Sequence, residues 1–248
     1  MAGAIGIIGG VGPMAGLDLA RQVFMQTKAT SDQDHIDLFL VSCPRLIPDR
    51  TEYLLHGGDD PAPGIEACAQ RLSAMGAAAI GVACNTAHSP RILSRVRVPS
   101  GVVLVNMIDS TCAFIAEHFG KGKIGIIATL GTIHTGIYDE YFARYPDLEL
   151  VKAPEQTNRS VHEAIYHREW GIKSTQRPTP QASEAVKGAV RELGQAGCSA
   201  VILGCTELPL VFQGQSSFEG IGLIDPTEVL ATELIRHTQP DKLIGIKL

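Results

Sequence analysis

The sequence lacks several patterns that mark common protein classes. None of its six cysteines forms a Cys-x-x-Cys pair, and a chain of 248 residues does not depend on disulfides, so we expect free thiols, no bound metal and a reducing cytoplasm. Apolar runs are too short to cross a bilayer, and the N-terminus lacks the basic and apolar regions of a secretory signal. The net charge of −5 argues against nucleic acid or an anionic membrane as partner.

What the sequence does contain is a regular alternation of short β-branched runs with longer amphipathic segments. Alternation of this kind is typical of α/β proteins with parallel sheets and helices on both faces. The expected strands are 4–10, 35–42, 77–84, 101–106, 123–129, 148–153, 199–205 and 221–225. The expected helices are 13–28, 61–75, 109–119, 135–145, 180–196 and 226–237.

The chain also repeats itself. "IGIIGGVG" matches "IGIIATLG", "RLSAMGAAAIGVACNT" matches "ELGQAGCSAVILGCTE", and "MIDSTCAFIAEH" matches "LIDPTEVLATELIRH", in order and 116 to 121 residues apart. We therefore predict two pseudo-symmetric, doubly wound lobes with mainly parallel sheets, residues 1–119 and 120–248. The last helix is free in this reading to cross back to the first lobe.

Cys84 and Cys205 occupy equivalent places in the two lobes. Each ends an expected strand, and polar residues follow: Asn85 and Thr86 in one lobe, Thr206 in the other. Because open α/β sheets bind ligands outside the carboxyl ends of their strands, we expect the active site in a cleft between the lobes. The other four cysteines are interpreted as packing residues.

Two thiols on opposite walls of a cleft suit proton transfer at a carbon atom. A cysteine at a helix N-terminus has a depressed pKa and can act as a base. One thiolate would remove a proton while the other thiol delivers one from behind, which inverts a stereocentre without a cofactor. The alternatives are two structural cysteines at the ends of buried strands, or a non-catalytic protein that binds a dicarboxylate or an amino acid.

The motifs "GIIGGVGPMAG", "LIPDRTEYLL", "GVACNTAHSP" and "VILGCTELPL" together resemble the aspartate/glutamate racemase family. The resemblance extends from Ile5 to about Thr232. It implies a two-base mechanism independent of pyridoxal phosphate (PLP), acting on a small amino-acid substrate, and a homodimer. The wider superfamily also includes maleate isomerases, hydantoin racemases and arylmalonate decarboxylases, so a maleate isomerase-like reaction stays an alternative.

The resemblance assigns roles to individual residues. It makes Cys84 and Cys205 the acid/base pair and places Arg50, of "PDRT", on the side-chain carboxylate of the substrate. Lys173, of "EWGIKS", resembles the family's second cationic residue. The polar residues Asn85, Thr86 and Thr206 would hold the α-carboxylate and α-amino groups.

Three further positions belong to the expected site or its surroundings. The turn "GGVGP" places the backbone N–H groups of Gly10 and Gly12 along the pocket, with Pro13 starting a helix. We expect a supporting rather than a catalytic role for His88.

The substrate preference follows from a departure from the family pattern. Glutamate racemases carry an aspartate-serine-glycine segment after the first strand and a histidine after the second Cys-Thr. This chain has "GGVGP" at the first position and Glu207 at the second, which favours aspartate, with glutamate as the alternative. An ionised Glu207 would raise the pKa of a neighbouring thiol.

Overall fold

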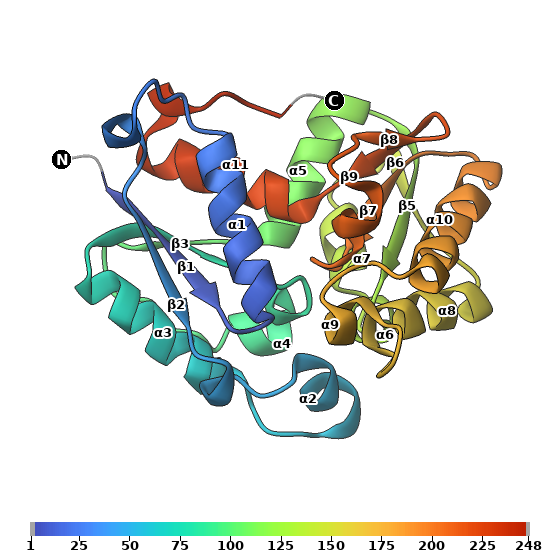
Figure 1. The fold of residues 1–248 in the computed structure, drawn as a ribbon, viewed down its shortest axis with the longest axis horizontal. Coiled ribbons are helices and arrows are strands. Elements are labelled where there is room, and N and C mark those ends of the chain that lie inside the picture. Colours follow the sequence, from blue (N-terminus) through green and yellow to red (C-terminus); the bar gives the residue numbers. More distant parts are fainter. Residues whose placement is uncertain (1–2, 247–248) are drawn as a thin grey trace. The chain divides into compact units, whose positions relative to one another are not determined.

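The computed structural model describes residues 3–246, and these fall into two compact units. One unit comprises residues 3–111 and 227–246, and the other comprises residues 112–226. The border therefore lies within helix α5 (Met107–Phe119). Strands and helices alternate along both units (Figure 1). The lobe boundary expected at residues 119 and 120 stays a prediction.

The first unit contains a parallel four-stranded sheet in the order β2-β1-β3-β4. Side chains alternate across β1, so that Ile5 and Ile7 join one apolar core and Ile8 joins another. The first core includes residues of α1 and α11, and the second includes residues of α3. The strands are β1 (Ala4–Gly9), β2 (Leu38–Ser42), β3 (Ala77–Val82) and β4 (Val103–Val105), and the helices are α1 (Pro13–Met25), α3 (Ala62–Ala74) and α11 (Pro226–Thr238).

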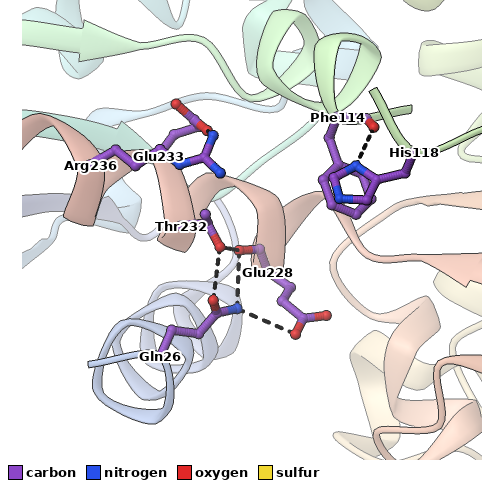
Figure 2. A network of polar contacts seen from close by, with 7 residues as sticks. All are labelled: Gln26, Phe114, His118, Glu228, Thr232, Glu233 and Arg236. Carbon is purple, nitrogen blue, oxygen red and sulfur yellow. Dashed lines mark hydrogen bonds and ion pairs between the residues drawn. The ribbon is translucent and has the colours of Figure 1, made fainter. Parts of the chain in front are cut away.

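Helix α11 is held in the first unit by apolar and polar contacts. Gly81 of β3 leaves room for Leu230 and Leu234, because a Cβ at this glycine would lie 2.9 Å from Cδ1 of Leu234. At the end of α1, the Gln26 amide donates to the Glu228 carboxylate at 3.3 Å and accepts from the Thr232 hydroxyl at 2.8 Å (Figure 2). The last helix of the chain thus completes the core beside β1 and β3.

Gly64 of α3 offers a strong test of the packing in this unit. A Cβ at Gly64 would lie 1.9 Å from the carbonyl oxygen of Leu46, which is backbone and cannot rotate away. We expect Gly64→Ala to lower the free energy of unfolding by about 1–3 kcal/mol, measured by urea denaturation. The control is Gly188→Ala in α10 (Pro180–Gln195), where nothing lies within 4 Å and alanine should stabilise the helix. Equal effects of both substitutions would contradict this packing.

The second unit repeats the arrangement of the first. Its sheet has the order β6-β5-β7-β9-β8, parallel except for the pairing of β8 with β9. The core on one face includes residues of β5, β7, α8 and α10. The strands are β5 (Gly122–Ala128), β6 (Leu148–Lys152), β7 (Cys198–Gly204), β8 (Ser217–Phe218) and β9 (Ile221–Ile224). On α5 of this unit, His118 stacks on Phe114 (Figure 2).

The predicted fold class, α/β with mainly parallel sheets, is confirmed. Strands β2-β1-β3-β4 of the first unit correspond in order to β6-β5-β7-β9 of the second, as the sequence repeat requires. All eight expected strands form, and β8 is an addition to them. Of the six expected helices, the one at 135–145 is shorter than expected and spans α7 (Ile137–Phe142).

The sequence patterns did not predict five helices, each of which lies in a connection that follows a strand. It left out α2 (Arg50–His56), α4 (Pro90–Leu93), α6 (Leu130–His134), α8 (Glu155–Tyr166) and α9 (Ile172–Thr175). Four of them are one or two turns long and carry too few residues for a helical period to be recognised. The fifth, α8, does show this period at its buried residues Val161, Ala164 and Ile165.

Candidate functional site

The first candidate half-site lies at the carboxyl edge of the first sheet. Because β1, β2 and β3 are parallel neighbours, the loops that follow them lie along one edge, and these loops begin at Gly10, Cys43 and Ala83. Gly10 has a positive φ of 82°, and a Cβ there would lie 2.8 Å from the backbone nitrogen of Cys43. Glycine is therefore required for the close approach of the first two loops.

Arg50 is hydrogen-bonded to the loop that follows β1, which contains Gly10 and Gly12. It is the first residue of α2, whose N-cap Asp49 accepts hydrogen bonds from the backbone N–H of Thr51 and of Glu52. Its Nη2 donates to the carbonyl oxygen of Val11 at 2.5 Å, and its Nη1 donates to that of Pro48 at 3.2 Å. A planar guanidinium is thus held beside the turn that follows β1.

Cys84 lies two residues beyond the end of β3 and is partly buried. Its backbone N–H donates to the carbonyl oxygen of Val82 at 2.8 Å, and the neighbouring Asn85 and Thr86 are buried. The chain continues as a single 3₁₀ turn, Thr86–His88, rather than as a regular α-helix.

His88 anchors the loop that carries Cys84. Its ring is fully buried, and Nδ1 lies 2.8 Å from the carbonyl oxygen of Cys84. Since a carbonyl can only accept, Nδ1 carries the hydrogen and donates it. Burial lowers the pKa of His88 to about 4, against the weaker opposing effect of the backbone of Cys84 and Val105. The ring is therefore neutral near pH 7 and fixes the position of the Cys84 backbone.

The buried His88 makes the stability of the first unit depend on pH. Between its ordinary value of 6.5 and its native value of about 4, a proton binds the unfolded chain but not the folded one. Stability therefore decreases as the pH falls through this range, by about 3 kcal/mol in total. We expect His88→Asn, which keeps a donor near Cys84, to flatten this dependence in urea titrations from pH 7 to pH 4. A variant with the same slope as the natural chain would show that His88 is not responsible.

The second candidate half-site is built around the carboxylate of Glu207. Cys205 follows the end of β7 directly, and its Sγ–H donates to Oε2 of Glu207 at 2.9 Å. The hydroxyl of Thr206 donates to the same oxygen at 3.1 Å, and the ammonium of Lys173 forms an ion pair with Oε1 at 2.5 Å. A thiol, a hydroxyl and an ammonium thus share one buried carboxylate.

The ionisation of this group of side chains follows from burial and mutual contact. Burial, and next the charge of Glu207, raise the pKa of the Cys205 thiol well above its usual value, while Lys173 opposes them. Burial alone would raise the pKa of Glu207, but the Lys173 ammonium and the hydrogen bonds to the carboxylate lower it overall. Burial would lower the pKa of Lys173, yet Glu207 and Cys205 raise it overall. The expectation of a depressed thiol pKa is therefore wrong for Cys205, because burial, and next the adjoining Glu207 carboxylate, raise its pKa.

Two residues that the sequence analysis missed support Lys173. Its ammonium lies 5.5 Å from the centre of the Tyr166 ring, and that ring packs against His162 one turn earlier on α8. His162 Nδ1 in turn accepts from the backbone N–H of Leu130 at 3.3 Å, at the first residue of α6. The helical period of α8 in the sequence could have placed His162 and Tyr166 on one face.

The structure brings the predicted site residues together in two groups. The first unit holds the group with the glycine turn, namely Gly10, Gly12, Arg50, Cys84, Asn85, Thr86 and His88. The second unit holds Lys173, Cys205, Thr206 and Glu207 in direct or shared contact. Each group has a thiol at a strand end and a cation that can bind a carboxylate.

All six cysteines are free thiols. In residues 3–246, no three His, Cys, Asp or Glu side chains come together as metal ligands would. No helix in the same range is long and apolar enough to cross a membrane. The two groups of site residues contain thiols that can act as acids or bases and cations that can bind a carboxylate.

The fold agrees with comparisons to known proteins. The family model described as Asp/Glu/hydantoin racemase matches residues 8–234. The chain belongs to this family. The structure resembles Picrophilus torridus aspartate racemase with a TM-score of 0.79 and 28% identity, over 95% of this chain and 94% of that one. It resembles glutamate racemase from Bacillus anthracis in fold, with a TM-score of 0.65 and 20% identity over 98% and 85% of the two chains.

Relatives found by sequence carry the name of glutamate racemase. One from Corynebacterium diphtheriae is 32% identical over 145 residues, which are 58% of this chain and 51% of that protein. Another, from Limosilactobacillus reuteri, is 30% identical over 162 residues, which are 64% and 54% of the two chains. The matches span about half the length of these curated relatives. They support membership of the family.

Proposed function

We propose that the chain is a PLP-independent racemase of an acidic amino acid, with aspartate as the preferred substrate and glutamate as the second candidate. Cys84 and Cys205 are the two bases, one for each face of the α-carbon. The observation that carries this proposal is that each thiol lies at the carboxyl end of the equivalent strand, β3 or β7, of a repeated sheet. Membership of the racemase family supports the same assignment.

In the proposed reaction, a thiolate on one side takes the α-proton and the electron pair of the C–H bond stays on carbon. The thiol on the other side then gives its proton to the opposite face of that carbon, and its own S–H electron pair becomes the new thiolate. One proton has been removed and one added, so the product is the mirror image of the substrate. No redox partner is required.

The remaining site residues bind the substrate in this proposal. Arg50 and Lys173 bind the side-chain carboxylate, since a guanidinium or an ammonium can form charge-assisted hydrogen bonds with it. The side chains of Asn85, Thr86 and Thr206 hold the α-carboxylate and α-amino groups, with backbone N–H groups of the Gly10–Gly12 turn. Holding both ends of the molecule exposes the α-hydrogen to one cysteine at a time.

Aspartate is preferred for two reasons. The structural relative from Picrophilus torridus is named aspartate racemase, and it matches this chain over almost its whole length. Glu207 also occupies the place after the second Cys-Thr at which glutamate racemases, by the family resemblance, carry histidine. A homodimer in the cytoplasm is the expected setting of the enzyme, and light scattering of the purified protein would test the dimer.

The experiment is incubation with L-aspartate, and separately with L-glutamate, in D₂O without added PLP. Loss of the α-proton signal by NMR, together with appearance of the D enantiomer in chiral analysis, is the expected result for aspartate. A protein that is folded and reduced but exchanges neither amino acid would overturn the proposal. Binding of aspartate without exchange would instead favour the dicarboxylate-binding alternative, and conversion of maleate would favour the isomerase alternative.

A further inference from the structure

Glu207 has a place in the second unit that substrate binding alone does not explain. Its side chain is buried, and its two oxygens accept from Lys173, Thr206 and Cys205. A residue that served only as a partner for Lys173 would not need to reach the thiol as well. The contact of 2.9 Å between Sγ of Cys205 and Oε2 of Glu207 therefore points to control of the thiol proton.

The direction of that control follows from charge. An ionised carboxylate next to a thiolate would place two negative charges in a buried site, so the thiol form of Cys205 is favoured and its S–H bond has an acceptor. The Lys173 ammonium, 2.5 Å from Glu207, keeps the carboxylate ionised. Tyr166 faces Lys173 from α8, and His162 faces Tyr166. Within the second unit, these contacts thus link Cys205 to the titratable side chains of Glu207 and Lys173, and through Lys173 to those of Tyr166 and His162.

We propose that Glu207 is a positioning residue that keeps the proton on Cys205 in the substrate-free protein, so that each turnover from this form begins with Cys205 as the acid. The protonation of Cys205 by itself does not depend on the proposed function, but the role of Cys205 as the acid in turnover does. There, the Cys84 thiolate takes the α-proton, and the Cys205 S–H bond breaks as its proton moves to the other face of the carbon. Afterwards Cys205 takes a proton from water and Cys84 releases one, which restores the starting form.

The test is a pH titration of Cys205 in substrate-free protein labelled with ¹³C at the cysteine β-carbons, with the Cys205 signal assigned by Cys205→Ser. The natural chain should keep the thiol signal far into the alkaline range. Glu207→Gln keeps the size of the side chain but removes the negative charge beside the thiol. It should lower the titration midpoint by about 1–3 pH units.

Two further variants test whether the shift of the Cys205 midpoint comes from the charge of Glu207. Glu184→Gln removes an exposed carboxylate on α10 that pairs with Arg191, and it should leave the Cys205 midpoint unchanged. Lys173→Met removes the cation that favours the thiolate and should move the midpoint in the opposite direction, which also covers failure of Glu207→Gln to fold. Overlapping Cys205 curves for the natural chain and Glu207→Gln, or a downward shift in Lys173→Met, would overturn the inference.

The consequence in turnover has its own measurement. With enzyme in excess over aspartate, one enantiomer should lose its α-proton faster than the other in the first turnover, because the free protein holds its proton on Cys205. Glu207→Gln should bring the two rates closer together. Equal rates in the natural chain would count against the inference. Absence of any exchange would defeat the proposed racemase activity, while the titration would still decide the role of Glu207.

Discussion

Loss of either strand-end cysteine is expected to lower racemisation of aspartate by about 10²–10⁴-fold, the range typical of a removed general acid or base. The variants are Cys84→Ser and Cys205→Ser, measured by chiral analysis of the product. Both should fail, since inversion needs a proton removed from one face and another delivered to the opposite face. Serine keeps the size of the side chain but is far too weakly acidic to replace the thiol as a base.

The matched control for this prediction lies on the same strand as Cys205. Cys198 is the first residue of β7, whereas Cys205 follows its last residue, and both are buried. Cys198→Ser should keep most of the racemase activity because it lies at the other end of the sheet. If it lost as much activity as Cys205→Ser, sensitivity of the strand to substitution would explain the result, and the proposed acid/base role would lose its support.

Proton exchange without inversion should separate the two cysteines further. Each variant retains one thiol, which can remove and return the α-proton of one enantiomer only. Cys205→Ser leaves Cys84, the base of the first proton transfer in the proposed reaction, and should exchange one enantiomer readily in D₂O. Cys84→Ser leaves a thiol that Glu207 keeps protonated, and its exchange should be slower. The reverse order would contradict both the acid/base assignment and the inference on Glu207.

Features that depend on local sequence patterns could be predicted, whereas contacts between residues distant in sequence could not. The repeat placed Cys84 and Cys205 at equivalent strand ends, because strand period and parallel connections depend on local patterns that a single sequence displays. The ion pair of Lys173 with Glu207 was not foreseen, since it joins α9 to the loop after β7 across 34 residues of sequence. Burial and the arrangement of three partners around Glu207 decide the thiol pKa, and neither can be read from spacing.

The errors near the site have one physical cause. Short elements such as α2, α9 and the 3₁₀ turn after Cys84 are fixed by caps and tertiary contacts rather than by a helical period. Arg50 was expected from its motif, yet its hydrogen bond to Val11 depends on Asp49 starting α2 at the right residue. The residue types of the site were thus more predictable than the local structures that hold them.

Removal of the Arg50 guanidinium is the second large effect that we expect. Arg50→Ala should reduce kcat/KM for aspartate by about 30-fold to several thousand-fold, which corresponds to about 2–5 kcal/mol for truncating one partner of a hydrogen-bonded charge pair. Arg50→Lys should recover only part of the loss, because an ammonium keeps the charge but not the planar fork that binds both carboxylate oxygens.

The neighbouring Arg45 supplies the control for Arg50. It lies in the same connection between β2 and α2 and is exposed, so Arg45→Ala removes an equal charge without touching the glycine turn. Arg50 also donates to Val11, so Arg50→Ala frees a carbonyl in that turn, and thermal unfolding must show that the variant is folded. A folded Arg50→Ala whose KM for aspartate matches that of Arg45→Ala would mean that Arg50 only supports the turn. A raised KM that Arg50→Lys partly restores would instead assign the substrate's side-chain carboxylate to this guanidinium.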